Sequence, residues 1–141
     1  MAFVYSQRVR FQHCDPAGIV FFPRYFEMLN ATVEEWFAER LGMPFAEMHG
    51  PMQGGVPTAS LRAEFRAPSR LGDLLDWRLT PRRLGRSSCE LGLTAACGAE
   101  LRAEFVQTLV WIDMASGRPR PWPENLHAKI QQELDMQEDA S

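Results

Sequence analysis

Residues 13–25, HCDPAGIVFFPRY, join a polar turn to the start of a long helix. The Asp-Pro-Ala-Gly sequence at 15–18 is typical of a turn, because proline fixes φ and glycine accepts turn conformations. Pro23 suits the first helical turn, where the N–H that proline lacks has no partner inside the helix. The stretch therefore predicts a carboxylate, Asp15, beside the free N–H groups of a helix N-terminus.

A helix is predicted from about Pro23 to Gly42. Its apolar residues recur at spacings of three and four, which makes one wide apolar face. They are Phe22, Tyr25, Phe26, Leu29, Val33, Trp36, Phe37 and Leu41. Gly42 suits the C-terminal cap. Asn30 falls inside this apolar face, so the pattern predicts a buried amide that needs a hydrogen-bond partner.

Five other segments alternate apolar and polar residues with a period of two, which predicts half-buried antiparallel strands. They lie at residues 3–11, 59–66, 75–80, 89–95 and 101–111. A helical turn within 43–53 and a short helix around 126–134 complete the pattern. One amphipathic helix and one sheet each have a single apolar face, so they must cover each other. We expect an α+β fold with a five-stranded antiparallel sheet around the helix.

Length and composition predict one domain over residues 1–141, with a frayed tail at 136–141. The chain carries a net charge of −3, which argues against nucleic-acid binding. It has no apolar run long enough to span a bilayer and no signal peptide pattern. Three cysteines without a CxxC pair fit reduced thiols, so we expect a cytoplasmic protein. Three scattered histidines predict no metal site.

The motif at 13–25, especially Asp-Pro-Ala-Gly-Ile-Val, resembles the active-site signature of the 4-hydroxybenzoyl-CoA thioesterase family. The resemblance extends more loosely over nearly the whole chain and implies the hotdog fold. It also implies a homodimer or a homotetramer, and a sheet with an unprotected edge makes self-association plausible on its own.

The resemblance implies that Asp15 is the catalytic carboxylate, which attacks the thioester carbonyl or activates water. From the residues alone, an ordinary turn residue is the favoured interpretation of Asp15, and the resemblance reverses that preference. The resemblance places the polarising amide at the backbone N–H of Phe22, where the family often has tyrosine or histidine. It places Gly18, Tyr25 and Asn30 at the substrate. The family's matching residue to Asn30 is an aspartate that faces an aromatic hydroxyl, and asparagine keeps the hydrogen bond without the charge.

The basic, polar turn near residues 82–88 is either a solvated hairpin tip or, as the resemblance implies, a site for coenzyme A phosphates at Arg83, Arg86 and Ser87. The expected function is hydrolysis of an aromatic, 4-hydroxybenzoyl-like, or short acyl-CoA. The expected protein has no cofactor, since coenzyme A is part of the substrate, and no nucleic-acid or membrane partner. The alternatives are a non-catalytic acyl-CoA-binding module and a hotdog dehydratase or hydratase, whose typical histidine-containing motif the chain lacks.

Overall fold

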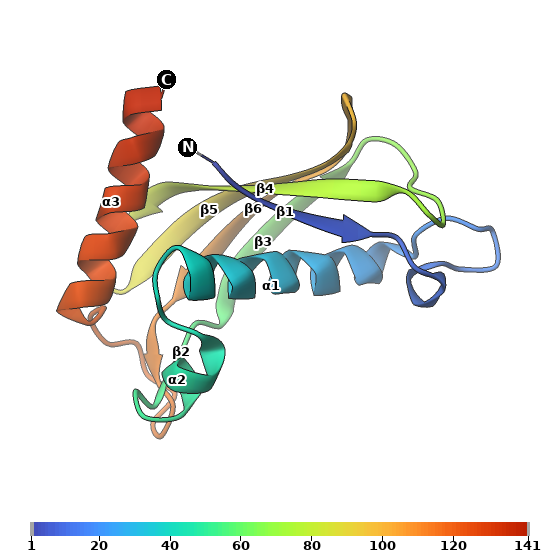
Figure 1. Cartoon of the computed structure of the whole chain (residues 1–141). Coiled ribbons are helices and arrows are strands. Elements are labelled where there is room, and N and C mark those ends of the chain that lie inside the picture. Colours follow the sequence, from blue (N-terminus) through green and yellow to red (C-terminus); the bar gives the residue numbers. More distant parts are fainter. Residues whose placement is uncertain (1, 141) are drawn as a thin grey trace.

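The computed structural model describes residues 2–140, and side chains up to residue 137. A long helix lies along one face of an antiparallel sheet, with a second helix standing at one end (Figure 1). The helices are α1 (Phe22–Glu39), α2 (Phe45–His49) and α3 (Glu124–Ala140). The strands are β1 (Phe3–Arg8), β2 (Gly54–Gly55), β3 (Thr58–Phe65), β4 (Leu74–Leu84), β5 (Ser88–Cys97), β6 (Glu100–Val110) and β7 (Ile112–Asp113).

The main sheet has the strand order β1-β4-β5-β6-β3, and every neighbouring pair is antiparallel. The strands β1 and β3 are therefore its edges, although they flank α1 in the sequence. This is the hotdog arrangement, and the predicted α+β fold is confirmed. The positions of its long helix and five main strands also match the sequence pattern.

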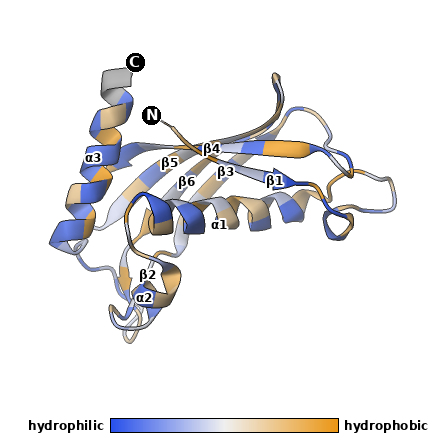
Figure 2. Ribbon diagram, viewed as in Figure 1, coloured by the Kyte–Doolittle hydropathy of each residue, from blue (hydrophilic) through white to orange (hydrophobic). Residues whose placement is uncertain are grey.

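The core lies between α1 and the sheet, where both apolar faces meet. Each turn of α1 carries both hydrophilic and hydrophobic residues (Figure 2). The largest fully buried side chains are Trp36, Trp77, Trp111, Phe37, Met28, Leu41, Met48, Leu75, Leu79, Leu91, Leu93 and Leu109. Beyond Arg40, the left-handed φ of Gly42 (+64°) turns the chain away from α1, as a glycine cap requires.

Helix α3 is longer than the short helix predicted around 126–134. It packs against β4 and the C-terminal end of α1, and Leu126 and Ile130 are buried there. Glu133 accepts a hydrogen bond from Trp36 Nε1 at 3.2 Å and pairs with Arg40 at 3.1 Å. Of the tail at 136–141, α3 includes the residues up to Ala140, and Ser141 lies outside the described residues.

The first strand is shorter than the alternation over 3–11 predicted. It ends at Arg8, and Phe11–His13 forms a 3₁₀ turn. The cause is local, because His13 Nδ1 accepts the Arg10 N–H at 2.8 Å and takes that donor out of any ladder. Phe11 is consequently 83% exposed, and the chain leaves the sheet early enough to form the loop that carries Asp15.

The two-residue strands β2 and β7 pair with each other and were not predicted. Glycine has no side-chain pattern, so Gly54–Gly55 gave no strand signal. The glycine at 54 is required by packing, since a Cβ there would lie 2.3 Å from the indole of Trp111. The pairing of β2 with β7 fixes the segment before β3 next to the segment that follows β6.

Candidate active site

Asp15 is oriented by its own turn. Its Oδ1 accepts the N–H of Ala17 at 2.9 Å, and its backbone carbonyl accepts the N–H of Gly18 at 2.9 Å. Gly18 has φ +80°, which favours glycine, and Asp15 N–H closes the loop onto Ile19 at 3.0 Å. Within residues 2–140 no hydrogen bond reaches Asp15 Oδ2. One carboxylate oxygen is thus fixed and the other is open to a reacting group.

The start of α1 leaves one backbone donor free. Phe21 caps the helix without a side-chain bond, Pro23 has no N–H, and Arg24 N–H donates to Phe21 at 2.8 Å. Among the described residues no acceptor takes the Phe22 N–H. A free N–H at the positive end of a helix stabilises negative charge on a nearby oxygen. The phenyl group of Phe22 is 56% exposed and leaves that end of the helix open.

The loop before β4 holds the Asp15 turn in place. Val20 N–H donates to the Ser69 carbonyl at 2.8 Å, and Ile19 forms a bridge with Arg70. The Ser69 side chain is fully buried, and its Oγ accepts from Tyr25 at 2.9 Å and from Arg102 at 3.2 Å. Ser69 therefore joins the turn, helix α1 and strand β6 at a single point.

Electrostatics stabilise this network. The Arg70 N–H and the Arg102 guanidinium lower the pKa of Asp73, which stays a carboxylate and accepts from Arg102 at 2.7 Å. Burial raises the pKa of Tyr25, so its hydroxyl stays protonated and donates to Ser69. Tyr25 is thus a buried support whose ring lines a hollow, and its hydroxyl is already engaged.

Tyr25→Phe removes only the hydroxyl from this network. We expect a loss of about 1 kcal/mol in the free energy of unfolding, since one buried hydrogen bond is lost, and a fall in kcat with little change in KM. Urea denaturation and steady-state kinetics measure the two effects. Tyr5→Phe is the matched control, because Tyr5 lies on β1 away from the turn. A loss of stability without any change in kcat would mean that the network stabilises the fold but does not contribute to catalysis.

The neighbours of Asp15 make other contacts. Burial lowers the pKa of His13, whose Nδ1 accepts the Arg10 N–H while its carbonyl accepts Phe21 N–H. Cys14 Sγ lies 3.6 Å from the Arg10 carbonyl. Both side chains are therefore used within the loop. In the described part of the chain, no three His, Cys, Asp or Glu side chains gather as metal ligands.

Two hollows flank the start of α1. The turn hollow, of about 310 Å³, is lined by Gln12, Cys14, Asp15, Pro16, Phe21 and Arg24. The helix-start hollow, of about 560 Å³, is more apolar and is lined by Ile19, Val20, Phe22, Tyr25, Phe65, Arg66, Ala67 and Pro68. Asp15 and the residue bearing the free N–H thus line neighbouring hollows within one chain. Gly18 is exposed at the turn and lines neither.

Asn30 lies in a third hollow, of about 390 Å³, toward the other end of α1. This α2 hollow is lined by Asn30, Val33, Phe45, His49, Gly55, Val56, Pro57, Leu109, Ile112 and Met114. The prediction of a buried Asn30 amide is wrong, because the residue is exposed. Its helical phase puts it at the rim of the apolar face of α1, beside α2 and the segment before β3. Asn30 does not share a hollow with Asp15 in the single chain.

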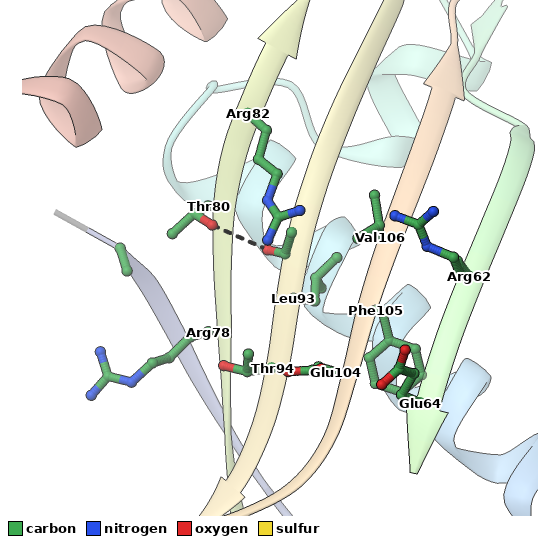
Figure 3. A pocket seen from close by; sticks show the side chains of 12 residues that line it. Arg62, Glu64, Arg78, Thr80, Arg82, Leu93, Thr94, Glu104, Phe105 and Val106 are labelled. Carbon is green, nitrogen blue, oxygen red and sulfur yellow. Dashed lines mark hydrogen bonds between the residues drawn. The ribbon is translucent and has the colours of Figure 1, made fainter. Parts of the chain in front are cut away.

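The basic residues near 82–88 divide between two surfaces. Arg82 lies on β4 and lines an outer hollow of about 530 Å³, on the sheet face turned away from α1 (Figure 3). Its guanidinium covers Gly92, where an added Cβ would lie 2.6 Å from Arg82 Nε. Arg83 follows a bulge in the β4–β5 pairing, and Arg86 is exposed in the turn itself.

The turn that carries Arg86 and Ser87 is hydrogen-bonded to the segments that follow β6 and β7. The Ser87 carbonyl accepts the Trp111 N–H at 2.7 Å, and the Arg86 carbonyl accepts the Trp122 N–H at 3.0 Å. Trp111 follows β6 between two residues that line the α2 hollow, Leu109 and Ile112. The turn is thus fixed at that end of the molecule, while the exposed side chains of Arg83 and Arg86 have no ion pair among the described residues.

Sequence patterns missed three residues that hold the Asp15 turn in place, Ser69, Asp73 and Arg102, and one that lines the α2 hollow, His49. Ser69 and Asp73 signalled only a turn, and Arg102 read as an ordinary polar position of a strand. His49 is one of three scattered histidines, a pattern that predicts no metal site. Each acquires its place through contacts between segments far apart in the chain, for which periodicity carries no signal. No helix of residues 2–140 is long and apolar enough to cross a membrane.

The chain is similar to known thioesterases. Residues 9–130 match the family described as the thioesterase-like superfamily. A 4-hydroxybenzoyl-CoA thioesterase from Pseudomonas sp. is 37% identical over 72 residues, which span 50% of each chain. A 1,4-dihydroxy-2-naphthoyl-CoA hydrolase from Nostoc punctiforme is 25% identical over 89% of this chain and 84% of that protein. The structure of a gentisyl-coenzyme A thioesterase matches with a TM-score of 0.81 and 27% identity, covering 88% of this chain and 98% of that one.

Proposed function

The chain belongs to the thioesterase-like superfamily, and we propose that it hydrolyses an aromatic acyl-CoA to the free acid and coenzyme A. The observation that carries this proposal is the pairing of a half-open carboxylate, Asp15, with an unused helix N–H at Phe22. A non-catalytic binding module has no need of such a carboxylate.

The two groups have complementary roles in hydrolysis. Asp15 Oδ2 attacks the thioester carbonyl carbon or removes a proton from the attacking water, and either step places negative charge on the carbonyl oxygen. The Phe22 N–H, at the positive end of α1, donates a hydrogen bond to that oxygen. The carbon–sulfur bond then breaks and the thiolate of coenzyme A leaves. If Asp15 is the nucleophile, water next hydrolyses the acyl–Asp15 anhydride and restores the carboxylate; if Asp15 is the base, the attacking water has already become the hydroxyl group of the acid.

Two observations support an aromatic acyl group: the names of the similar proteins and the aromatic lining of the helix-start hollow. The three similar proteins are named for the 4-hydroxybenzoyl, 1,4-dihydroxy-2-naphthoyl and gentisyl thioesters. The helix-start hollow is bordered by Phe22, Tyr25 and Phe65, whose rings pack edge-on or tilted at 5.5 to 6.2 Å. Such surfaces suit a flat ring.

We propose that a second copy of the chain completes the site. Nearly every residue of the edge strand β3 is exposed, including Leu61 (39%) and Phe65 (46%). At the other edge, β1 is tied to α1 by Gln7 Nε2, which donates to the Met28 carbonyl at 2.7 Å. An exposed edge strand with apolar side chains is a template for pairing.

The geometry of such a pair explains why the site residues are divided. The α2 hollow adjoins the beginning of β3 through Val56 and Pro57, and the helix-start hollow adjoins its end through Phe65. A twofold axis across antiparallel β3 strands brings the beginning of one strand beside the end of the other. The α2 hollow of one copy would then face the helix-start hollow of its partner, which begins at Ile19 directly after the Asp15 turn, so the homodimer would be the active form.

The test of the proposed function is release of free thiol from a panel of acyl-CoA substrates. We expect turnover of 4-hydroxybenzoyl-CoA and related aryl-CoA thioesters by the purified chain without an added metal or cofactor. Binding of these thioesters without release of thiol would instead favour an acyl-CoA-binding module. Hydration of an enoyl-CoA would favour the hydratase alternative.

Arg83 and Arg86 are proposed to hold the phosphates of coenzyme A. Arg83→Ala and Arg86→Ala should raise KM for acyl-CoA more than they lower kcat, since contacts far from the carbonyl stabilise ground and transition states alike. The effect should shrink at high salt, which screens exposed charges. Arg118→Ala, at an exposed position beyond β7, is the control. An equal effect on a truncated thioester without the nucleotide would contradict this role.

A further inference from the structure

The α2 hollow has an apolar lining with two polar side chains, Asn30 and His49. They come from different elements, since Asn30 lies on α1 and His49 is the last residue of α2. Among the described residues no hydrogen-bond partner is found for either side chain. Two polar groups without partners in an apolar concave surface are the usual form of a specificity site.

The imidazole of His49 is oriented by packing. Its ring stands edge-on to Phe45, one helical turn earlier, with centroids 5.4 Å apart and planes at 80°. Met48, fully buried beside it, anchors α2 to the core. The ring is therefore held at the hollow while both of its nitrogens stay available to a ligand.

Gly55 keeps the space in front of His49 open. A Cβ at this position would lie 2.9 Å from Met114 Sδ and 3.8 Å from His49 Nε2. Any side chain longer than a methyl group would extend into this region. The lack of a side chain at Gly55 thus leaves room for Met114 and for the imidazole at the border of the hollow.

We propose that His49 is a further specificity-determining residue, which binds a hydroxyl group on the ring of the acyl group beside Asn30, the position that the resemblance already places at the substrate. The proposal rests on the proposed thioesterase function and on the second copy whose helix-start hollow faces this hollow. An imidazole and an amide can each accept a hydrogen bond from a phenol, and both can donate one. An acyl group with an unsubstituted ring would remove water from both side chains without giving them a hydrogen-bond partner. Its thioester should therefore react more slowly.

The test compares kcat/KM for 4-hydroxybenzoyl-, 3-hydroxybenzoyl-, benzoyl- and butyryl-CoA in the wild type, His49→Leu and His49→Gln. We expect His49→Leu to reduce the preference for at least one hydroxybenzoyl thioester over benzoyl-CoA by about ten-fold or more. His49→Gln should retain part of the preference, because glutamine still donates and accepts. Butyryl-CoA, which has no polar substituent, should change least.

His127→Leu, on α3, and Asn30→Leu, in the same hollow, are the comparison variants. The first should leave all ratios unchanged, and the second should shift them in the same direction as His49→Leu. Binding of non-hydrolysable thioether analogues gives the same comparison without turnover. If the wild type hydrolyses these thioesters and His49→Leu leaves every ratio unchanged, the role of His49 is refuted while the proposed function stands. If the wild type hydrolyses none of them, the proposed function fails and the role of His49 fails with it.

Discussion

Asp15→Asn is expected to lower kcat by at least about a thousand-fold while leaving the fold intact. The amide keeps the size of the side chain and can still accept the Ala17 N–H through its oxygen. It can neither attack a thioester carbonyl nor take a proton from water. Thiol release from 4-hydroxybenzoyl-CoA measures the change, and the circular dichroism spectrum and melting temperature report the fold.

Asp135→Asn is the matched control, since Asp135 is an exposed carboxylate on α3 whose one hydrogen-bond partner among the described side chains is Gln131. It should retain wild-type turnover. Turnover near the wild-type rate in a folded Asp15→Asn protein would remove this carboxylate from the mechanism. The hydrogen-bonded shape of the turn would then have a structural role alone.

Leu61→Glu is expected to convert the proposed homodimer into a monomer and to lower kcat/KM by about a hundred-fold, since the proposed acyl-binding hollow and the partner's site would no longer face each other. Leu61 lies near the middle of the exposed strand β3. A twofold pair would bring the two new carboxylates close together, where like charges repel. Sedimentation velocity gives the oligomeric state. Met136→Glu, which also exposes a new carboxylate at an apolar position, on α3, should leave the dimer intact.

Complementation tests the composite site directly. Val56→Trp should fill the α2 hollow, and Asp15→Asn should remove the carboxylate, so each variant alone should be inactive. A heterodimer of the two has one site in which both parts are wild type. Random association would then restore about a quarter of wild-type activity in the co-expressed mixture. An inactive mixture of folded dimers would mean that each chain carries its own complete site.

The sequence predicted the secondary structure of the core well because that structure follows from short-range patterning. The apolar stripe of α1 and the alternation of the main strands both reflect one buried face per element. The prediction of the first strand failed at residues 9–11, where apolar and polar residues still alternate. There a side-chain acceptor, His13 Nδ1, competes successfully for the Arg10 N–H, and periodicity does not register such a local hydrogen bond.

The site was only partly predictable. The turn at Asp15 and the helix start at Phe22 are encoded locally by proline, glycine and the onset of helical periodicity, and both form as expected. Asn30 has the right spacing for the core and is nevertheless exposed at the rim of a hollow. The position of a residue in a helix fixes the direction of its side chain. The width of the buried face of the helix depends on which strands and helices pack against it.

The sequence by itself determined the elements of this protein, the turn that presents a carboxylate, and the family to which its signature belongs. These are properties of neighbouring residues, whose conformations are coupled through local sterics and hydrogen bonds. Only the tertiary structure decided that Ser69 joins the Asp15 turn to α1 and β6, and that His49 shares a hollow with Asn30. It also left β3 at the edge of the sheet. Contacts between segments far apart in the chain depend on how the apolar faces pack together, and packing is a property of the whole fold.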